Sequence, residues 1–279
     1  MLLPLDGQPT SEIAFIGLRA LAGSEPQELR LLYAGDDPDG AHLAYLERVA
    51  GLFRDLGHRP SPQVRPGDPA QVIVETAQAL PADLVILKRD EREGIKGWVL
   101  GSITDKVARS LRCPLLLMNP LSGDGRWLDY RIRQVMVPLD GSASAERAIA
   151  VALPLAHRLD ARVTVMYSIP WLHATYLAGP EMIAAGSMSA QTDARLEADM
   201  HVYLDGLVAR YGERPSLERI AMRGKAADAI TVAAAKHAVD LIIMTTQGAG
   251  GILHRGLGRV AEAVTKRSGV PLLLVPPSS

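Results

Sequence analysis

The sequence VPLDG at residues 137–141 decides how the chain is organised, because a close copy, LPLDG, occurs 134 residues earlier at residues 3–7. Two further blocks repeat in the same order at a spacing of 157: DLVIL at 83–87 returns as DLIIM at 240–244, and PLLLM at 114–118 returns as PLLLV at 271–275. Blocks that repeat in one order indicate a duplicated unit. The growth in spacing from 134 to 157 predicts an insertion of about 23 residues in the second copy, between its first and second blocks.

Short apolar runs alternate with helical periodicity throughout the second copy. Strands are expected at residues 133–139, 162–168, 217–222, 241–244 and 271–275, and helices at 148–159, 193–211, 226–238 and 258–267. The first copy follows the same order. Strands that alternate with helices are typical of parallel βαβ units, in which helices cover both faces of one sheet.

The composition describes a protein with a packed core and no broad charged face. Of 279 residues, 48% are apolar, and 30 Lys and Arg against 31 Asp and Glu give a formal net charge of −1. This balance, together with few aromatic residues, argues against a nucleic-acid-binding protein. A single cysteine, Cys113, excludes an internal disulfide. No signal peptide and no apolar run of membrane-spanning length is apparent, so we expect a cytoplasmic protein without a membrane helix.

The boundary between the copies is expected at residues 119–125, NPLSGDG, which have the composition of a linker. We therefore place the first domain at residues 1–121 and the second at 132–279. The insertion falls at about residues 171–191. It is either a mobile lid or partner-docking segment, or an ordered extension packed on the neighbouring copy.

Three loops of the second copy follow expected strands, at the sheet edge where open α/β folds bind ligands. The first contains Asp140, whose carboxylate either caps the next helix or accepts a hydrogen bond from a nucleotide's amine or ribose hydroxyl. The others, TTQGAGG at 245–251 and GLGRV at 256–260, are rich in glycine. Glycine lets backbone N–H groups approach a phosphate, although tight turns between strand and helix use it as well.

These loops resemble those of the universal stress protein family. The family's nucleotide motif, Gly-x2-Gly-x9-Gly-Ser/Thr with Thr often in first place, maps onto Thr245, Gly248, Gly258 and Arg259. The resemblance covers both halves and implies an adenine nucleotide alpha hydrolase-like α/β fold. Each half would be a doubly wound unit of five parallel strands in the order 3-2-1-4-5. It further implies that the fifth strands meet across a two-fold axis, which makes the chain an intrachain pseudo-dimer and leaves a homodimer of whole chains open.

The resemblance also implies that the C-terminal copy binds ATP, or ADP or AMP. The adenine and ribose contacts it assigns are Pro138, Leu139, Asp140 and Ser168. The phosphate contacts it assigns are Met244, Thr245, Gln247, Gly248, Gly258, Arg259 and Val260. Arg259 departs from the motif's Ser or Thr, and it can either clamp a phosphate or occupy the place of the terminal one.

The first copy keeps only part of the motif. Gly101 and Ser102 match its end, but Lys88 and Glu91 stand at the earlier glycine positions. We expect this copy to bind nucleotide weakly or not at all and to be structural. The charged run from Lys88 to Glu91 is interpreted as a solvated loop.

Catalytic signatures are missing from the sequence. The seven histidines show no metal-ligand spacing, neither the P-loop nor the dinucleotide fingerprint is satisfied in context, and no general base is placed to activate water. We expect at most slow ATP hydrolysis. The sequence leaves two hypotheses: a nucleotide-binding stress or signalling protein that acts through its conformation or an unknown protein partner, and a nucleotide-free scaffold of the same fold.

Overall fold

The computed structural model describes residues 1–22, 25–79, 82–89, 101–119, 130–169, 185–211, 217–248 and 257–277. The N-terminal half contains β1 (Leu2–Pro4), the 3-10 helix η1 (Pro9–Glu12), α1 (Ile13–Ala22), β2 (Glu28–Ala34), α2 (Ala41–Asp55), β3 (Arg59–Arg65), α3 (Pro69–Ala79), β4 (Val85–Lys88), α4 (Ser102–Ser110) and β5 (Leu115–Met118). The C-terminal half contains β6 (Gln134–Leu139), α5 (Ala143–Leu159), β7 (Arg162–Ile169), α6 (Ala185–Tyr211), β8 (Leu217–Arg223), α7 (Ala226–Lys236), β9 (Leu241–Thr245), α8 (Arg259–Arg267) and β10 (Leu272–Val275).

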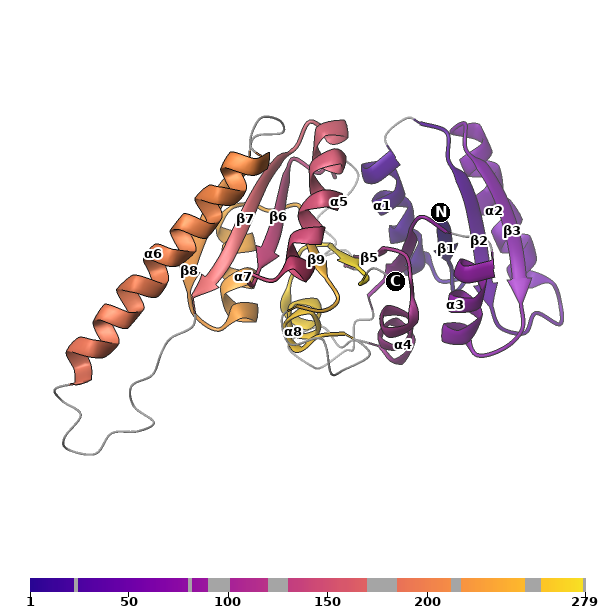
Figure 1. The fold of residues 1–279 in the computed structure, drawn as a ribbon. Coiled ribbons are helices and arrows are strands. Elements are labelled where there is room, and N and C mark those ends of the chain that lie inside the picture. Colours follow the sequence, from indigo (N-terminus) through magenta and orange to yellow (C-terminus); the bar gives the residue numbers. More distant parts are fainter. Residues whose placement is uncertain are drawn as a thin grey trace.

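All ten strands form one sheet in the order β3-β2-β1-β4-β5-β10-β9-β6-β7-β8 (Figure 1). Every neighbouring pair is parallel except β5 and β10, which run antiparallel with Leu116 opposite Leu273. Within each half the strand order is therefore 3-2-1-4-5, and the two halves join through their fifth strands. This confirms the expected fold class, including the pseudo-dimer within one chain.

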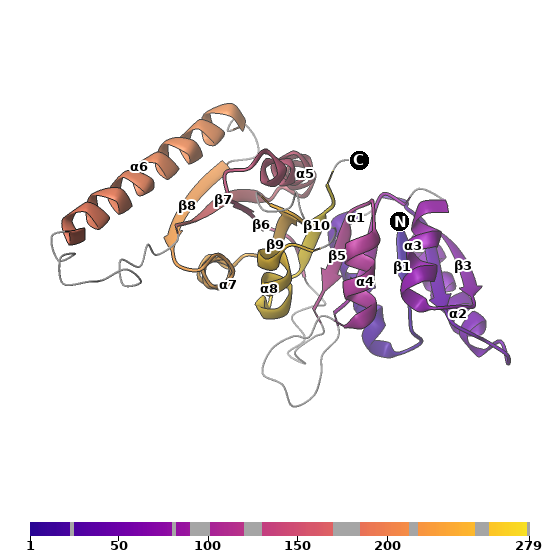
Figure 2. The same cartoon turned by 60° about the horizontal axis from the view of Figure 1, so that its bottom comes forward.

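Helices cover both faces of the sheet, as alternating strands and helices require. The core on one face includes residues from α1, α2, α5 and α6, and the core on the other includes residues from α3, α4, α7 and α8 (Figure 2). The side chains of adjacent strand residues point to opposite faces of the sheet, so Leu2 belongs to the second core and Leu3 to the first. The sheet is thus buried on both sides, which explains the uninterrupted apolar runs of its central strands.

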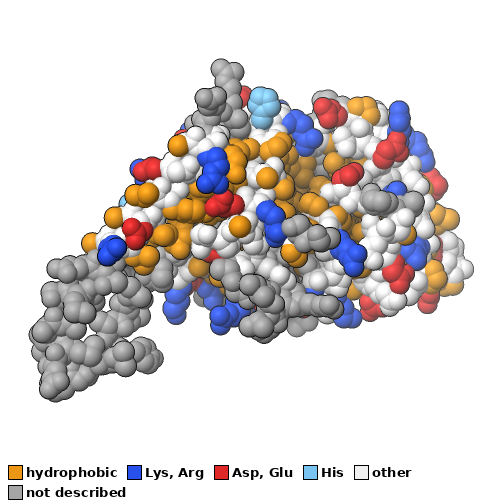
Figure 3. All heavy atoms as spheres, viewed as in Figure 1, with side chains coloured by type: hydrophobic (Ala, Val, Ile, Leu, Met, Phe, Trp, Pro, Cys, Tyr) orange, Lys and Arg blue, Asp and Glu red, His pale blue; other side chains and the backbone are white. Residues whose placement is uncertain are grey.

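The helix expected at 193–211 begins earlier, at Ala185, and extends well beyond the sheet (Figure 1). The beginning of α6 therefore lies inside the expected insertion, while residues 170–184 lie outside the described residues. Hydrophobic side chains gather along α6 and also in the middle of the same face, over α5 and α1 (Figure 3). The expected domain boundary lies mostly on residues 120–129, which are also outside the described residues.

Candidate functional site

The turn between β6 and α5 is organised by Asp140 and Ser142. Ser142 is the N-cap of α5, because its hydroxyl accepts a hydrogen bond from the Ala145 N–H at 3.1 Å. Asp140 Oδ1 in turn accepts bonds from the Ser142 N–H at 3.0 Å and from the Ser142 hydroxyl at 2.6 Å. The capping role considered for Asp140 thus belongs to Ser142. Asp140 itself is exposed at the carboxyl edge of the sheet.

The loop after β9 is tied to its surroundings by hydrogen bonds at two of its residues, Thr246 and Gln247. The Thr246 N–H donates to the carbonyl of Val275 on β10 at 2.9 Å. The carbonyl of Gln247 accepts from the hydroxyls of Thr245 at 2.8 Å and Ser144 at 2.9 Å. These bonds hold the start of the loop between β10 and the first turn of α5, beside Asp140.

Gly248 is glycine because its backbone lies against Asp140. A Cβ atom at Gly248 would stand 2.1 Å from Asp140 Oδ2, much closer than atoms in contact can approach. Loop and carboxylate are therefore in direct contact, and any side chain at this position would have to displace one of them.

Gly258 makes a second close approach and is the N-cap of α8. Its N–H donates to the Thr246 carbonyl at 2.6 Å, and a Cβ there would stand 3.1 Å from the same oxygen. The first intrahelical bond of α8 runs from the Glu262 N–H to the Gly258 carbonyl at 2.9 Å. The N–H groups of Arg259 and Val260 belong to the first turn, where no intrahelical partner exists and an anion is favoured.

The site residues expected from the sequence lie at one edge of the sheet, but they differ in the atoms that they can offer to a ligand. Pro138 and Leu139 are buried at the end of β6, and Met244 is buried in β9, so these three can offer mainly backbone atoms. Ser168, near the end of β7, donates its hydroxyl to the Gly224 carbonyl at 3.0 Å. Arg259 and Val260 are both exposed at the start of α8.

Two tyrosines beside Asp140 were missed by the sequence reasoning. The rings of Tyr167 and Tyr203 meet edge to face with their centroids 6.3 Å apart, and the Tyr203 hydroxyl donates to Glu146 at 2.9 Å. Burial and the nearby charge of Asp140 raise the pKa of Tyr167, so its hydroxyl remains protonated at neutral pH. Its position was detectable, because Tyr33 stands 134 residues before it in the first copy.

The equivalent edge of the N-terminal half is occupied by its own side chains. Lys88 Nζ lies 3.5 Å from Asp6 Oδ2, so the counterpart of Asp140 is paired with a lysine. The His42 ring stacks on Tyr33 with centroids 3.7 Å apart, and its Nδ1 lies 3.1 Å from Asp37 Oδ1. Asp6 and Tyr33, the equivalents of Asp140 and Tyr167, are thus engaged by side chains of this half, and its structural role stays a prediction.

The expectation of a solvated charged run is wrong for Arg89. This side chain is only 1% exposed, and its guanidinium donates to the carbonyls of Thr265 and Ser268 in the C-terminal half. The run follows β4 close to the junction of the halves, which places a long cationic side chain next to the end of α8. Residues 90 and 91 lie outside the described residues.

The described residues hold neither a metal-ligand cluster nor a membrane-spanning helix. They contain no group of three or more His, Cys, Asp or Glu side chains arranged to hold a metal ion. None of the helices described there combines the length and the apolar character needed to cross a membrane.

The chain is similar to known proteins over most of its length. The Universal stress protein family matches residues 1–119 and 131–276. A universal stress protein of Mycobacterium tuberculosis is 26% identical over 206 residues, which cover 74% of this chain and 65% of that protein, just under two thirds of its length. A universal stress protein of Thermus aquaticus is 29% identical over 143 residues, covering 51% of this chain and 98% of the relative.

Solved structures support the fold over the whole chain. A universal stress protein from Archaeoglobus fulgidus has a TM-score of 0.71 at 20% identity, covering 100% of this chain and 98% of that one. A functionally unknown protein from Pseudomonas aeruginosa has a TM-score of 0.74 at 19% identity, covering 99% and 92%. At this level of identity the likeness establishes the arrangement of elements and nothing about ligands.

Proposed function

The chain belongs to the universal stress protein family, and we propose that its C-terminal half binds ATP, ADP or AMP. The bound nucleotide would favour one conformation or partner surface over another, and this would serve a stress-response or signalling role. We propose binding without dedicated turnover, with one nucleotide per chain.

The observation that carries the proposal is the pair of close approaches at Gly248 and Gly258. Both glycines border one loop, and a side chain at either would meet Asp140 or the Thr246 carbonyl. Next to them, the first turn of α8 offers backbone N–H groups to an anion. A backbone that comes this close to its neighbours, at a helix N-terminus, has the chemistry of a phosphate cradle.

The charges at this edge of the sheet favour one orientation of the bound nucleotide. Asp140 would repel phosphate and accept hydrogen bonds from the ribose hydroxyls or the adenine amine. The phosphate groups would lie toward Gly258 and the N–H groups of Arg259 and Val260, where the exposed guanidinium of Arg259 adds a positive charge. The backbone of Pro138, Leu139 and Met244 would border the base, along with Ser168.

A nucleotide-free scaffold is the second candidate, and the same contact favours it. With Gly248 against Asp140, the loop lies on the carboxylate that the nucleotide needs. In the binding proposal this loop opens by a small movement, whereas in the scaffold it stays closed. The two functions therefore differ in a measurable property of the purified protein.

The test is to denature the purified chain and assay the supernatant for adenine nucleotides, and then to compare thermal melts with and without ATP. Ligand at 100 times its Kd stabilises a protein by about 2.7 kcal/mol, which corresponds to a rise in Tm of roughly 5–10 °C for a chain of this size. GTP is the matched control for recognition of the base. Finding neither bound nucleotide nor a shift with ATP would overturn the binding proposal and favour the scaffold.

A further inference from the structure

Arg89 joins the two halves at a place far from the proposed nucleotide. It directly follows β4, and its N–H donates to the Met118 carbonyl on β5 at 2.8 Å. Its guanidinium leaves the N-terminal half and ends on two carbonyls of the C-terminal half, those of Thr265 and Ser268. The side chain is almost fully buried there.

The two carbonyls belong to the C-terminal end of α8. Thr265 lies in the last turn and Ser268 is the C-cap. The last carbonyls of a helix lack intrahelical donors and carry the negative end of the helix dipole, so a cation that donates to them is favoured. The guanidinium suits this position because its planar fork presents several N–H groups at once.

A second buried side chain supports the same contact. The Asn119 amide also donates to the Ser268 carbonyl, at 3.4 Å, and Asn119 is 1% exposed. Burying a cation is costly unless it is well hydrogen-bonded. Burial lowers the pKa of Arg89 to about 9, which leaves it charged at neutral pH. The buried guanidinium donates to two carbonyls at the end of α8, and the Asn119 amide donates to one of the same carbonyls, so the N-terminal half anchors this end of the helix.

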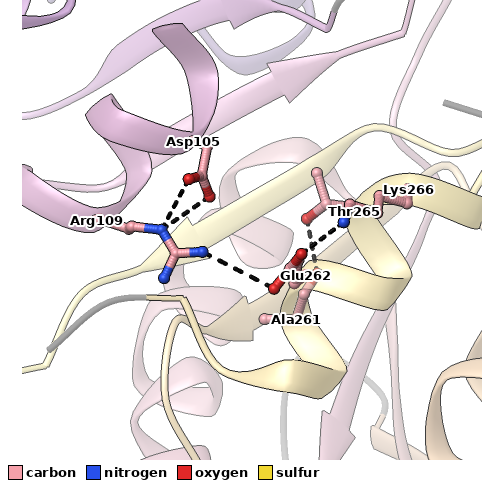
Figure 4. A network of polar contacts seen from close by, with 6 residues as sticks. All are labelled: Asp105, Arg109, Ala261, Glu262, Thr265 and Lys266. Carbon is pink, nitrogen blue, oxygen red and sulfur yellow. Dashed lines mark hydrogen bonds and ion pairs between the residues drawn. The ribbon is translucent and has the colours of Figure 1, made fainter. Parts of the chain in front are cut away.

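The other end of α8 begins at the proposed phosphate site. The helix runs from Arg259 to Arg267, a rigid segment of roughly 14 Å, with Gly258 as its N-cap. Its side is held less firmly: Arg109 of α4 lies 3.8 Å from Glu262, and both side chains are partly exposed (Figure 4). Such exposed pairs contribute little. Among the polar contacts of the described residues, those of Arg89 and Asn119 are therefore the buried ones between this helix and the N-terminal half.

The repeat places Arg89 at the position that Thr246 has in the second copy. At the spacing of 157, Arg89 corresponds to Thr246 and Met118 to Val275. The backbone bonds are equivalent, since the Thr246 N–H donates to the Val275 carbonyl at 2.9 Å just as Arg89 donates to Met118. One copy keeps threonine at this position in its glycine-rich loop, and the other has an arginine that reaches the helix of its partner half.

We propose that Arg89 is a positioning residue for the nucleotide site of the opposite half. By fixing the C-terminal end of α8, it holds the first-turn N–H groups of Arg259 and Val260 where a phosphate needs them. The inference rests on the proposed nucleotide binding. In this inference the N-terminal half influences the affinity of the C-terminal half for the nucleotide. Nucleotide binding and the contact between the halves are then coupled.

The test compares Arg89→Met, Arg89→Lys and Arg158→Met by calorimetric titration of ATP into the full chain. Arg158 is the matched control, because it also crosses between the halves and donates to a carbonyl at a helix C-terminus, that of Leu21 on α1, at 2.9 Å. That helix does not begin at the nucleotide loop. We expect Arg89→Met to weaken ATP binding about tenfold, Arg89→Lys to recover part of the loss, and Arg158→Met to change Kd less than twofold.

Urea unfolding of each variant separates positioning from stability. A variant that is 99% folded loses only about 1% of its apparent affinity through unfolding, so a tenfold loss must arise at the site. If Arg89→Met does not fold, Arg89→Lys and Asn119→Ala replace it, each with an expected loss of about threefold. A folded Arg89 variant with wild-type Kd overturns the inference alone, whereas a wild-type chain that binds no ATP overturns the proposed function and the inference with it.

Discussion

Replacing Gly248 by alanine tests the close contact between the loop and Asp140 at the proposed nucleotide site. The new Cβ would stand 2.1 Å from Asp140 Oδ2, whereas ordinary contacts begin near 3.4 Å. Either the carboxylate or the loop must therefore retreat by more than 1 Å. Asp140 is exposed, so its side chain has room to swing away. We expect the fold to survive and the site to be damaged.

The magnitude follows from the bonds that Asp140 makes. Its Oδ1 accepts from the N–H and the hydroxyl of Ser142, and swinging the carboxylate away strains or breaks one of them. A hydrogen bond of this kind contributes about 0.5–1.5 kcal/mol, so the free energy of unfolding should fall by about 1 kcal/mol. In the binding proposal the nucleotide reaches the Asp140 carboxylate after a small movement of the loop, and a carboxylate that has swung away can no longer accept its hydrogen bonds. We therefore expect ATP affinity to fall at least tenfold, equivalent to about 1.4 kcal/mol of binding free energy.

The assay is calorimetric titration of ATP, with urea unfolding on the same preparations. Gly206→Ala is the matched control, because Gly206 lies within α6 and a Cβ there meets nothing within 4 Å. It should leave Kd unchanged and raise stability by up to about 1 kcal/mol through helix propensity. If Gly248→Ala is folded and binds ATP like the wild type, the contact with Asp140 has no part in nucleotide binding and the site has been wrongly placed.

Three further predictions concern the fold that carries the site. Tyr130→Phe removes the bond from the Tyr130 hydroxyl to the Asp240 carbonyl at 2.6 Å, so urea unfolding should show a loss of about 1 kcal/mol, and no loss would contradict the role given to that bond. Gly17→Ala should destabilise by about 1 kcal/mol although alanine favours helix, because its Cβ would stand 2.8 Å from the Met118 sulfur in a closely packed core; a gain in Tm would show that this core can adjust. Partial burial opposes ionisation of Asp37, but hydrogen bonds from the backbone N–H groups of His42 and Leu43 outweigh it and lower its pKa below 3.8. The stabilising effect of Asp37 should be complete above pH 3.8 and should disappear as the pH falls through its lowered pKa in the folded state. The difference in stability between the wild type and Asp37→Asn should therefore shrink in acid. A difference that does not depend on pH would refute this.

The repeat was enough to predict a duplicated α/β unit, whereas the strand order and the junction of the halves were implied by the resemblance to the universal stress protein family. Each copy ends in a short apolar strand that would be an unprotected edge on its own, and pairing these edges buries both. The antiparallel register of Leu116 and Leu273 confirms that interpretation. The glycine motif marked Gly248 and Gly258 as phosphate contacts, which stays a prediction, while their close approaches to Asp140 and to the Thr246 carbonyl were seen only in the structure.

Side-chain partners across the junction could not be predicted in this way. Arg89 meets the Thr265 carbonyl, which is 176 residues away in the sequence, and a charged run is usually solvated, so local reasoning gave the wrong environment. The stacking of His42 on Tyr33 likewise joins the first turn of α2 to β2. At the turn after β6, the sequence analysis considered Asp140 as a capping residue, and only the geometry assigns the cap to Ser142.

The stoichiometry of ATP binding tests the central claim most directly. Calorimetric titration of the full chain should give one ATP per chain, because the C-terminal half has the glycine-rich loop and the N-terminal half has Lys88 paired with Asp6 at the equivalent place. A value of two would show that the N-terminal half also binds nucleotide. No binding at all would contradict the account and leave the chain as a scaffold.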